Sequence, residues 1–83
     1  MQPYRFITED EVLETFIRLS LRKREGLLEA FQQLTMHAPG AGELVYRDEN
    51  GRMIFRWEWK RWRIWFWDDG PVNEVRIVDV EEV

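Results

Sequence analysis

The chain has 83 residues, enough for one domain, and it contains no cysteine, which excludes disulfides, thiolate metal sites and cysteine nucleophiles. Its net charge is −4, so the protein lacks the overall basic field with which nucleic-acid-binding proteins capture their ligand. The charge is uneven, because residues 1–42 carry −1, residues 43–67 carry +2 and residues 68–83 carry −5. Any contact with RNA must therefore rely on a local patch in the middle of the chain.

We expect a single domain over residues 1–83 that is cytoplasmic and makes no membrane contact. The longest apolar run is too short to span a bilayer, and the N-terminus lacks the apolar core of a signal peptide. Twelve aromatic residues are available to fill the core of so short a chain.

A short strand and a first helix are predicted at the N-terminal end. Residues 4–7 are apolar-rich, as in a strand. Thr8 and Glu11 then have the spacing of a capping box, in which each side chain accepts from the other residue's backbone N–H. The apolar residues that follow share one helical face, which predicts a helix over residues 9–19.

A second helix is predicted over residues 21–35, with an apolar stripe on one face. Gly26 lies inside it and costs the helix about 1 kcal/mol relative to alanine. Either a close contact compensates for this cost or the helix begins after Gly26. Pro39 and the glycines around it end the helix.

The remainder of the chain is predicted to form strands, since apolar and polar residues alternate through it. Asn50-Gly51 is a strong hairpin signal, whereas around residues 60–61 the chain either bends or turns back. The fold class is therefore α+β, with a short N-terminal strand and a two-helix hairpin packed on an antiparallel β-meander. The predicted strands of the meander are Glu43–Arg47 and residues 52–60, 62–67 and 74–80.

A basic and aromatic ladder runs through residues 52–67, and its part from residue 55 onward contains all five tryptophans. Such a surface binds phosphates through guanidinium groups while its rings stack on bases. The alternative is a solvated sheet face on which the arginines stack on tryptophans and pair with Glu58. The cations of the ladder are Arg52, Arg56, Lys60, Arg61 and Arg63.

The tryptophans are too many for one buried face. If the first three are core residues, Trp65 and Trp67 fall on the opposite side, unless the strand bends. An exposed pair of tryptophans indicates a protein partner or a homodimer. The alternative is that a tail or a neighbouring strand covers them.

Other polar residues give no sign of catalysis or of a metal site. His37, the one histidine, is interpreted as a capping group at the end of the second helix. Asp79, Glu81 and Glu82 are interpreted as a solvated acidic tail, so we expect no metal and no cofactor.

The order of strand, helical hairpin and meander resembles the RelE/ParE toxin superfamily of bacterial type II toxin–antitoxin systems. Residues 19–34 resemble the family's helical hairpin, in which a Leu-rich break precedes a basic helix start and an apolar stripe, and the helix ends at a proline, here Pro39. Residues 62–66, Trp-Arg-Ile-Trp-Phe, resemble the family's Tyr-Arg-(Ile/Leu)-aromatic strand. Residues 75–80 resemble its last strand, so the resemblance spans nearly the whole chain.

The resemblance implies a metal-independent endoribonuclease that acts on mRNA at the ribosome and pairs with a cognate antitoxin. In that reaction the ribose 2′-OH attacks phosphorus, which requires a base, a group that stabilises the charged phosphate and an acid for the leaving oxygen. Arg63 aligns with the family's strand arginine, and Glu58 is placed as the base. The predicted catalytic residues are thus Arg63, Glu58 and Lys60, and the predicted RNA-binding residues are Arg56, Arg61 and Arg52.

The C-terminus departs from the family pattern. Family members commonly continue past the last strand with Gly, Arg, His or Tyr residues that complete the site, whereas here the sequence reads Glu81-Glu82-Val83. The departure leaves open a nuclease-dead relative and the gyrase-poisoning branch. It also leaves open a non-enzymatic interaction module that uses Trp65 and Trp67, and a single-stranded nucleic-acid binder.

Overall fold

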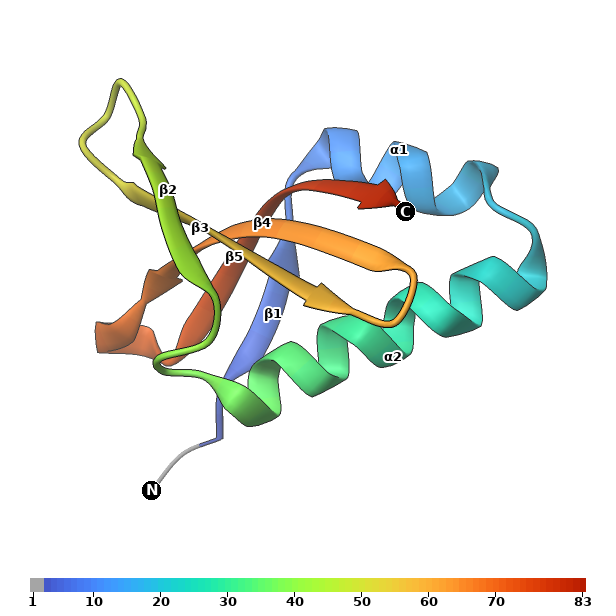
Figure 1. The fold of residues 1–83 in the computed structure, drawn as a ribbon, viewed down its shortest axis with the longest axis horizontal. Helices are drawn as coiled ribbons and strands as arrows, with labels where there is room; N and C mark the ends of the chain where they lie inside the picture. The colour runs from blue at the N-terminus through green and yellow to red at the C-terminus, as the bar shows by residue number, and fades with distance from the viewer. Residues whose placement is uncertain (1–2) are drawn as a thin grey trace.

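Five strands and two helices form the computed structural model, which describes residues 3–83 (Figure 1). They follow the predicted order of strand, helical hairpin and meander, which confirms the α+β fold. The elements are β1 (Arg5–Thr8), α1 (Asp10–Arg18), α2 (Leu21–His37), β2 (Glu43–Arg47), β3 (Met53–Trp59), β4 (Trp62–Asp69), the 3-10 turn η1 (Gly70–Val72) and β5 (Glu74–Glu82).

The strands form one mixed sheet in the order β1-β5-β4-β3-β2. Strands β2 to β5 make the antiparallel meander. Strand β1 joins it beside β5 in the parallel direction, with Phe6 paired to Val75. The first and last strands of the chain are therefore neighbours, and β2 is left as an edge strand.

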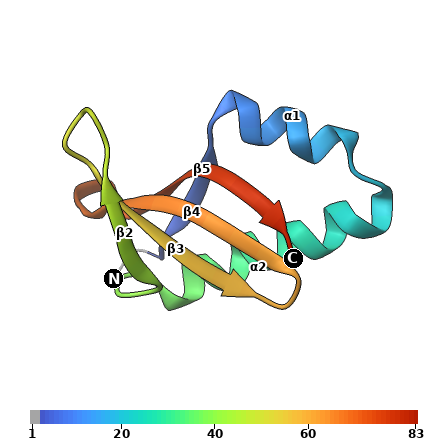
Figure 2. The ribbon, with the colours of Figure 1, turned by 45° about the horizontal axis from the view of Figure 1, so that its top comes forward.

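Both helices cover the same face of this sheet (Figure 2). Alternate residues of the central strand β4 are buried beneath them, and the residues in between lie on the uncovered face, which we call the open face. No helix in residues 3–83 has the length and apolar character that crossing a membrane requires. The buried cluster comprises Val12, Leu27, Ala30, Phe31, Leu34, Trp62, Ile64, Phe66, Val75 and Ile77.

The capping box predicted at the start of the first helix is wrong. Thr8 is the last residue of β1, where it pairs with Ile77, so it remains in the extended sheet. Glu9 takes the cap position without a side-chain cap, and its backbone N–H donates to the carbonyl of Ile77 at 3.1 Å. Pairing with β5 thus decides where α1 begins.

The second helix passes through Gly26 without interruption. Ser20 caps its N-terminus, and the Ser20 hydroxyl accepts from the N–H of Lys23 at 3.3 Å. A close contact is the reason for the glycine. A Cβ atom at Gly26 would lie 3.3 Å from the indole nitrogen of Trp62, which is tighter than ordinary packing. Gly26 therefore lets α2 approach β4.

At residues 60–61 the chain turns back rather than bending. Trp59 and Trp62 pair across this two-residue turn. Lys60 has a φ of 53°, which is in a backbone region that residues other than glycine seldom adopt. The strands β3 and β4 are consequently held in a tight hairpin, which fixes which residues of each strand face the helices.

Two glycines in the loop between α2 and β2 give a test of this packing. Gly40 and Gly42 have φ of 97° and 76°, but only a Cβ at Gly42 would meet another atom, the Arg56 carbonyl oxygen at 2.6 Å. Both alanine variants incur backbone strain, and Gly42→Ala adds a clash with the β3 backbone. We expect Gly42→Ala to lower the free energy of unfolding by about 1 kcal/mol more than Gly40→Ala. Urea denaturation measures both, and equal losses would contradict the contact.

Candidate functional site on the open sheet face

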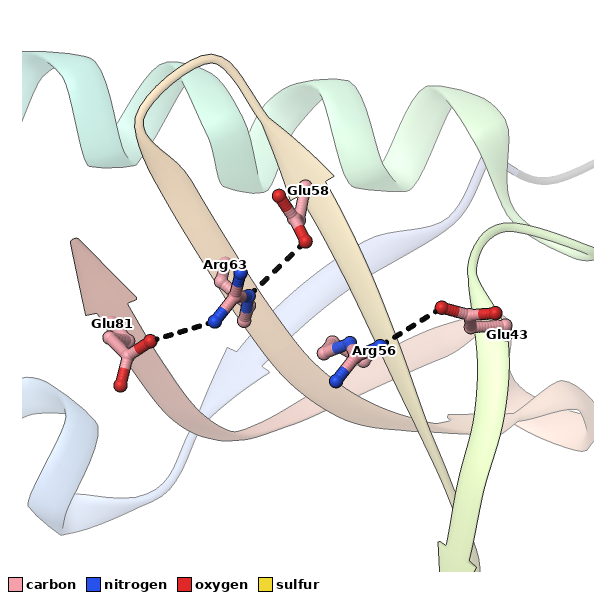
Figure 3. Close-up of polar contacts among 5 residues, drawn as sticks. All are labelled: Glu43, Arg56, Glu58, Arg63 and Glu81. Atoms are coloured by element: carbon pink, nitrogen blue, oxygen red, sulfur yellow. Dashed lines mark hydrogen bonds and ion pairs between the residues drawn. The ribbon is translucent and has the colours of Figure 1, made fainter. Parts of the chain in front are cut away.

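Arg63 lies near the end of the open face that adjoins the β3–β4 turn, between two carboxylates (Figure 3). Sheet pairing brings Glu58 of β3 and Glu81 of β5 directly beside it. The Arg63 Nε–H donates to Glu58 at 3.2 Å, and a terminal N–H donates to Glu81 at 3.0 Å. Since a guanidinium has five N–H donors, three remain available to a ligand.

A second row of side chains crosses the same face. Arg56 of β3 pairs with Glu43 of β2 on one side and Trp65 of β4 on the other. Its guanidinium donates to the Glu43 carboxylate at 3.0 Å (Figure 3). Asp79 of β5 follows next to Trp65 in the same row. Arg56 and Arg63 are thus brought onto one face, each with a carboxylate partner.

The charge of these two rows is negative rather than basic. Two guanidinium groups face four carboxylates, so the net charge is −2. This favours the alternative reading of the ladder, in which Arg63 pairs with Glu58. The carboxylates are Glu43, Glu58, Asp79 and Glu81.

Lys60, which was predicted to be catalytic together with Glu58 and Arg63, does not join them on this face. The turn at residues 60–61 directs its ammonium toward α2, where it lies 3.2 Å from the Glu29 carboxylate. It also lies 5.7 Å from the Trp59 ring centroid. Arg61 is exposed at the tip of the same turn. Of the three predicted catalytic residues, the structure therefore brings together Glu58 and Arg63.

Arg52 lies directly before β3, where Asp48 and Trp67 position it. Its Nε–H donates to the Asp48 carboxylate at 2.8 Å, and its guanidinium carbon lies 5.0 Å from the centroid of the Trp67 ring. Burial alone would raise the pKa of Asp48, but hydrogen bonds from Arg52 and Asn50, together with the Arg52 charge, lower it below its usual value. These contacts keep Arg52 apart from the two rows of side chains that contain Arg63 and Arg56, which we call the Arg63 rows.

Trp65 and Trp67 do lie on the open face, but they are not an exposed pair. Both are half-buried. Two guanidinium groups lie over the Trp67 ring, with the carbon of Arg52 at 5.0 Å and that of Arg76 at 5.7 Å from its centroid. These cation–π contacts cover part of the Trp67 ring, one of the two side chains that the sequence assigned to a partner surface.

Glu81 is the site residue that the sequence analysis missed. It was assigned to a solvated tail, but β5 continues to Glu82 and places Glu81 against Arg63. The missed signal was alternation past residue 80, since the acids Asp79 and Glu81 flank the apolar Val80. A terminal segment in which polar and apolar residues continue to alternate is expected to continue the strand.

His37 lies on the covered side of the sheet. Its Nδ1 is 2.8 Å from the Gln33 carbonyl at the end of α2, and its ring lies 5.7 Å from that of Trp57. This agrees with the interpretation of His37 as an end-of-helix residue. Within residues 3–83, no group of three or more His, Asp or Glu side chains is placed to hold a metal ion.

Comparisons with known proteins identify the fold. No family model matches the sequence, and no curated protein matches it. Among solved structures, the chain is similar to one from the RelBE2 toxin–antitoxin complex of Mycobacterium tuberculosis, with a TM-score of 0.79. The similarity covers 99% of this chain and 100% of the other at 18% sequence identity. The fold is therefore RelE-like over its full extent.

The Asp48 contacts predict how stability depends on pH. Because folding lowers the pKa of Asp48, its stabilisation is present above the unfolded pKa of about 3.9 and is lost as pH falls through the folded value. Asp48→Asn should therefore lower the melting temperature at pH 7, and its difference from the parent should shrink below about pH 4.

Glu49→Gln is the matched control, because Glu49 is an exposed acid in the same turn. We expect it to leave the melting temperature nearly unchanged at both pH values. If the Asp48→Asn difference persisted undiminished to pH 2, the carboxylate would not be the stabilising species.

Proposed function

We propose that this protein is the toxin-type member of a toxin–antitoxin pair, that it cleaves RNA slowly at Glu58 and Arg63, and that an antitoxin binds it. The observation that carries the proposal is the direct cross-strand contact of 3.2 Å between these two side chains on the open face of a RelE-like fold. The RelBE2 structure is itself a toxin–antitoxin complex, which motivates the antitoxin partner. The reaction would take place in the cytoplasm, on mRNA at the ribosome.

Arg63 suits the role of phosphate stabiliser. Three N–H donors remain after its two carboxylate contacts, and a guanidinium binds two phosphate oxygens at once. Glu58 and Glu81 hold the guanidinium in place from both sides. The same carboxylates repel an incoming phosphate, so affinity for RNA is expected to be weak and sensitive to salt.

Glu58 suits the role of general base. The 2′-OH loses its proton to the carboxylate while its oxygen bonds to phosphorus, the bond to the 5′-oxygen breaks, and a 2′,3′-cyclic phosphate and a 5′-hydroxyl result. Arg56 would contact a neighbouring phosphate, although its Glu43 partner competes for it. Within these rows no histidine, lysine or tyrosine can protonate the leaving oxygen, so water must do so and turnover is slow.

Expression in bacteria followed by RNA end analysis tests the proposal. We expect growth arrest, with transcripts that end in 2′,3′-cyclic phosphate. Glu58→Gln and Arg63→Ala should each lower the cleavage rate by about 10²- to 10³-fold, because they remove the base and the charge stabilisation. Arg18→Ala is the matched control, since Arg18 is an exposed cation at the end of α1.

Equal cleavage by the parent and by both site variants would exclude the proposed chemistry. Growth arrest without cleavage, unchanged by Arg63→Ala, would point instead to a target other than RNA. Co-expression with the product of an adjacent reading frame tests the antitoxin part, since a cognate antitoxin should restore growth.

A second candidate function is a non-enzymatic interaction module. It is favoured by the edge strand β2, where Leu44, Val45 and Tyr46 expose 55%, 37% and 50% of their surface. These residues replace the tryptophan pair as the apolar surface for a partner or for a second copy of the chain. Sedimentation would show a dimer that Val45→Lys dissociates, because a charged residue on an edge strand opposes pairing.

A further inference from the structure

A pocket of about 360 Å³ lies between the first turns of α2 and the β3–β4 turn. Three of its lining side chains are cationic and one is acidic, so it is locally positive in a protein of net charge −4. The Arg63 rows lie on the opposite face of the sheet. The lining residues are Arg22, Lys23, Gly26, Arg61, Trp62 and Glu82.

The arginines of this pocket are available to a ligand. Lys23 pairs with Glu82 at 2.9 Å, but among residues 3–83 no carboxylate pairs with Arg22 or Arg61. Arg56 and Arg63, by contrast, both have carboxylate partners. Free guanidinium groups therefore gather at this pocket and not in the Arg63 rows.

A buried donor forms the floor of the pocket. Trp62 is 5% exposed, and its indole N–H has no hydrogen-bond acceptor among the described residues. The indole nitrogens of Trp59 and Trp67 also lack partners, but they are sealed from solvent. An N–H left without an acceptor costs free energy unless water or a ligand accepts from it.

Gly26 keeps this floor open. A Cβ there would lie 3.3 Å from the Trp62 nitrogen and would fill the space above the N–H. In addition, the first turn of α2 carries no acidic residue to offset its partial positive charge. Both features increase the attraction for an anion that accepts hydrogen bonds.

We propose that this pocket binds a phosphate group, either of a nucleic-acid backbone or of a small phosphate compound. One phosphate oxygen would accept from the Trp62 N–H, and the guanidinium groups of Arg22 and Arg61 would bind the others. Lys23 would remain with Glu82 and contribute long-range attraction. The site does not depend on cleavage at Glu58 and Arg63.

Nitrogen-15 NMR of the five indole N–H signals tests the proposal directly. The Trp62 signal is assigned from its loss in Trp62→Phe. We expect inorganic phosphate to shift it more than any other indole signal, with a dissociation constant on the order of millimolar, whereas chloride at equal ionic strength does not. Arg22→Gln and Arg61→Gln should each weaken binding about tenfold, as loss of a charge-assisted contact implies.

Gly26→Ala, which places a methyl group above the N–H, should also weaken binding. Arg18→Gln is the control that should leave the phosphate affinity of the pocket unchanged. The Trp62 signal reports on this pocket and not on the opposite face of the sheet, so failure here is separable from failure of the ribonuclease proposal. A single-stranded RNA oligonucleotide that binds more tightly than inorganic phosphate identifies a nucleic-acid backbone, and the reverse identifies a small phosphate. The proposal is overturned if Trp62 shows no selective shift, or if Arg18→Gln weakens binding as much as Arg61→Gln.

Discussion

The alternation of side chains along β4 is the constraint on which the rest of the structure depends. Trp62 and its alternate neighbours are buried under the helices, so Arg63 must point to the open face. A shift of one residue in the pairing would bury the arginine and expose the tryptophan, at the cost of both the core and the site. The tight turn at residues 60–61 and the approach of α2 at Gly26 maintain this register.

This alternation, together with the turn at residues 60–61, makes three consecutive residues serve two surfaces. Arg61 and Trp62 line the pocket beside α2, whereas Arg63 lies between Glu58 and Glu81 on the other face. The two phosphate sites that we propose would therefore lie on opposite faces of one short segment of chain. A substitution on one face leaves the residues of the other face in place, so the two faces can be studied separately.

The charged residues of the open face contribute little to the stability of the fold. The ion pairs of Arg63 are partly exposed, with 31% to 55% of each side chain accessible, and such pairs stabilise a fold by only about 0–1 kcal/mol. Their main effect is to orient the guanidinium and to reduce the positive potential of the open face. A RelE-like fold is thus present with an acidic open face, and its function must be argued from the site.

The element order and the faces of most strands follow from the sequence alone, because a period of two and a period of 3.6 residues distinguish strand from helix locally. The Glu58–Arg63 contact could also be predicted from the sequence, since both residues lie in one hairpin. The sequence could not determine that Glu81 reaches Arg63, that Lys60 turns toward Glu29, or that Gly26 opens a space over Trp62. Each of these depends on the distance between segments far apart in the chain, and only packing of the helices and of β5 against the hairpin fixes such distances.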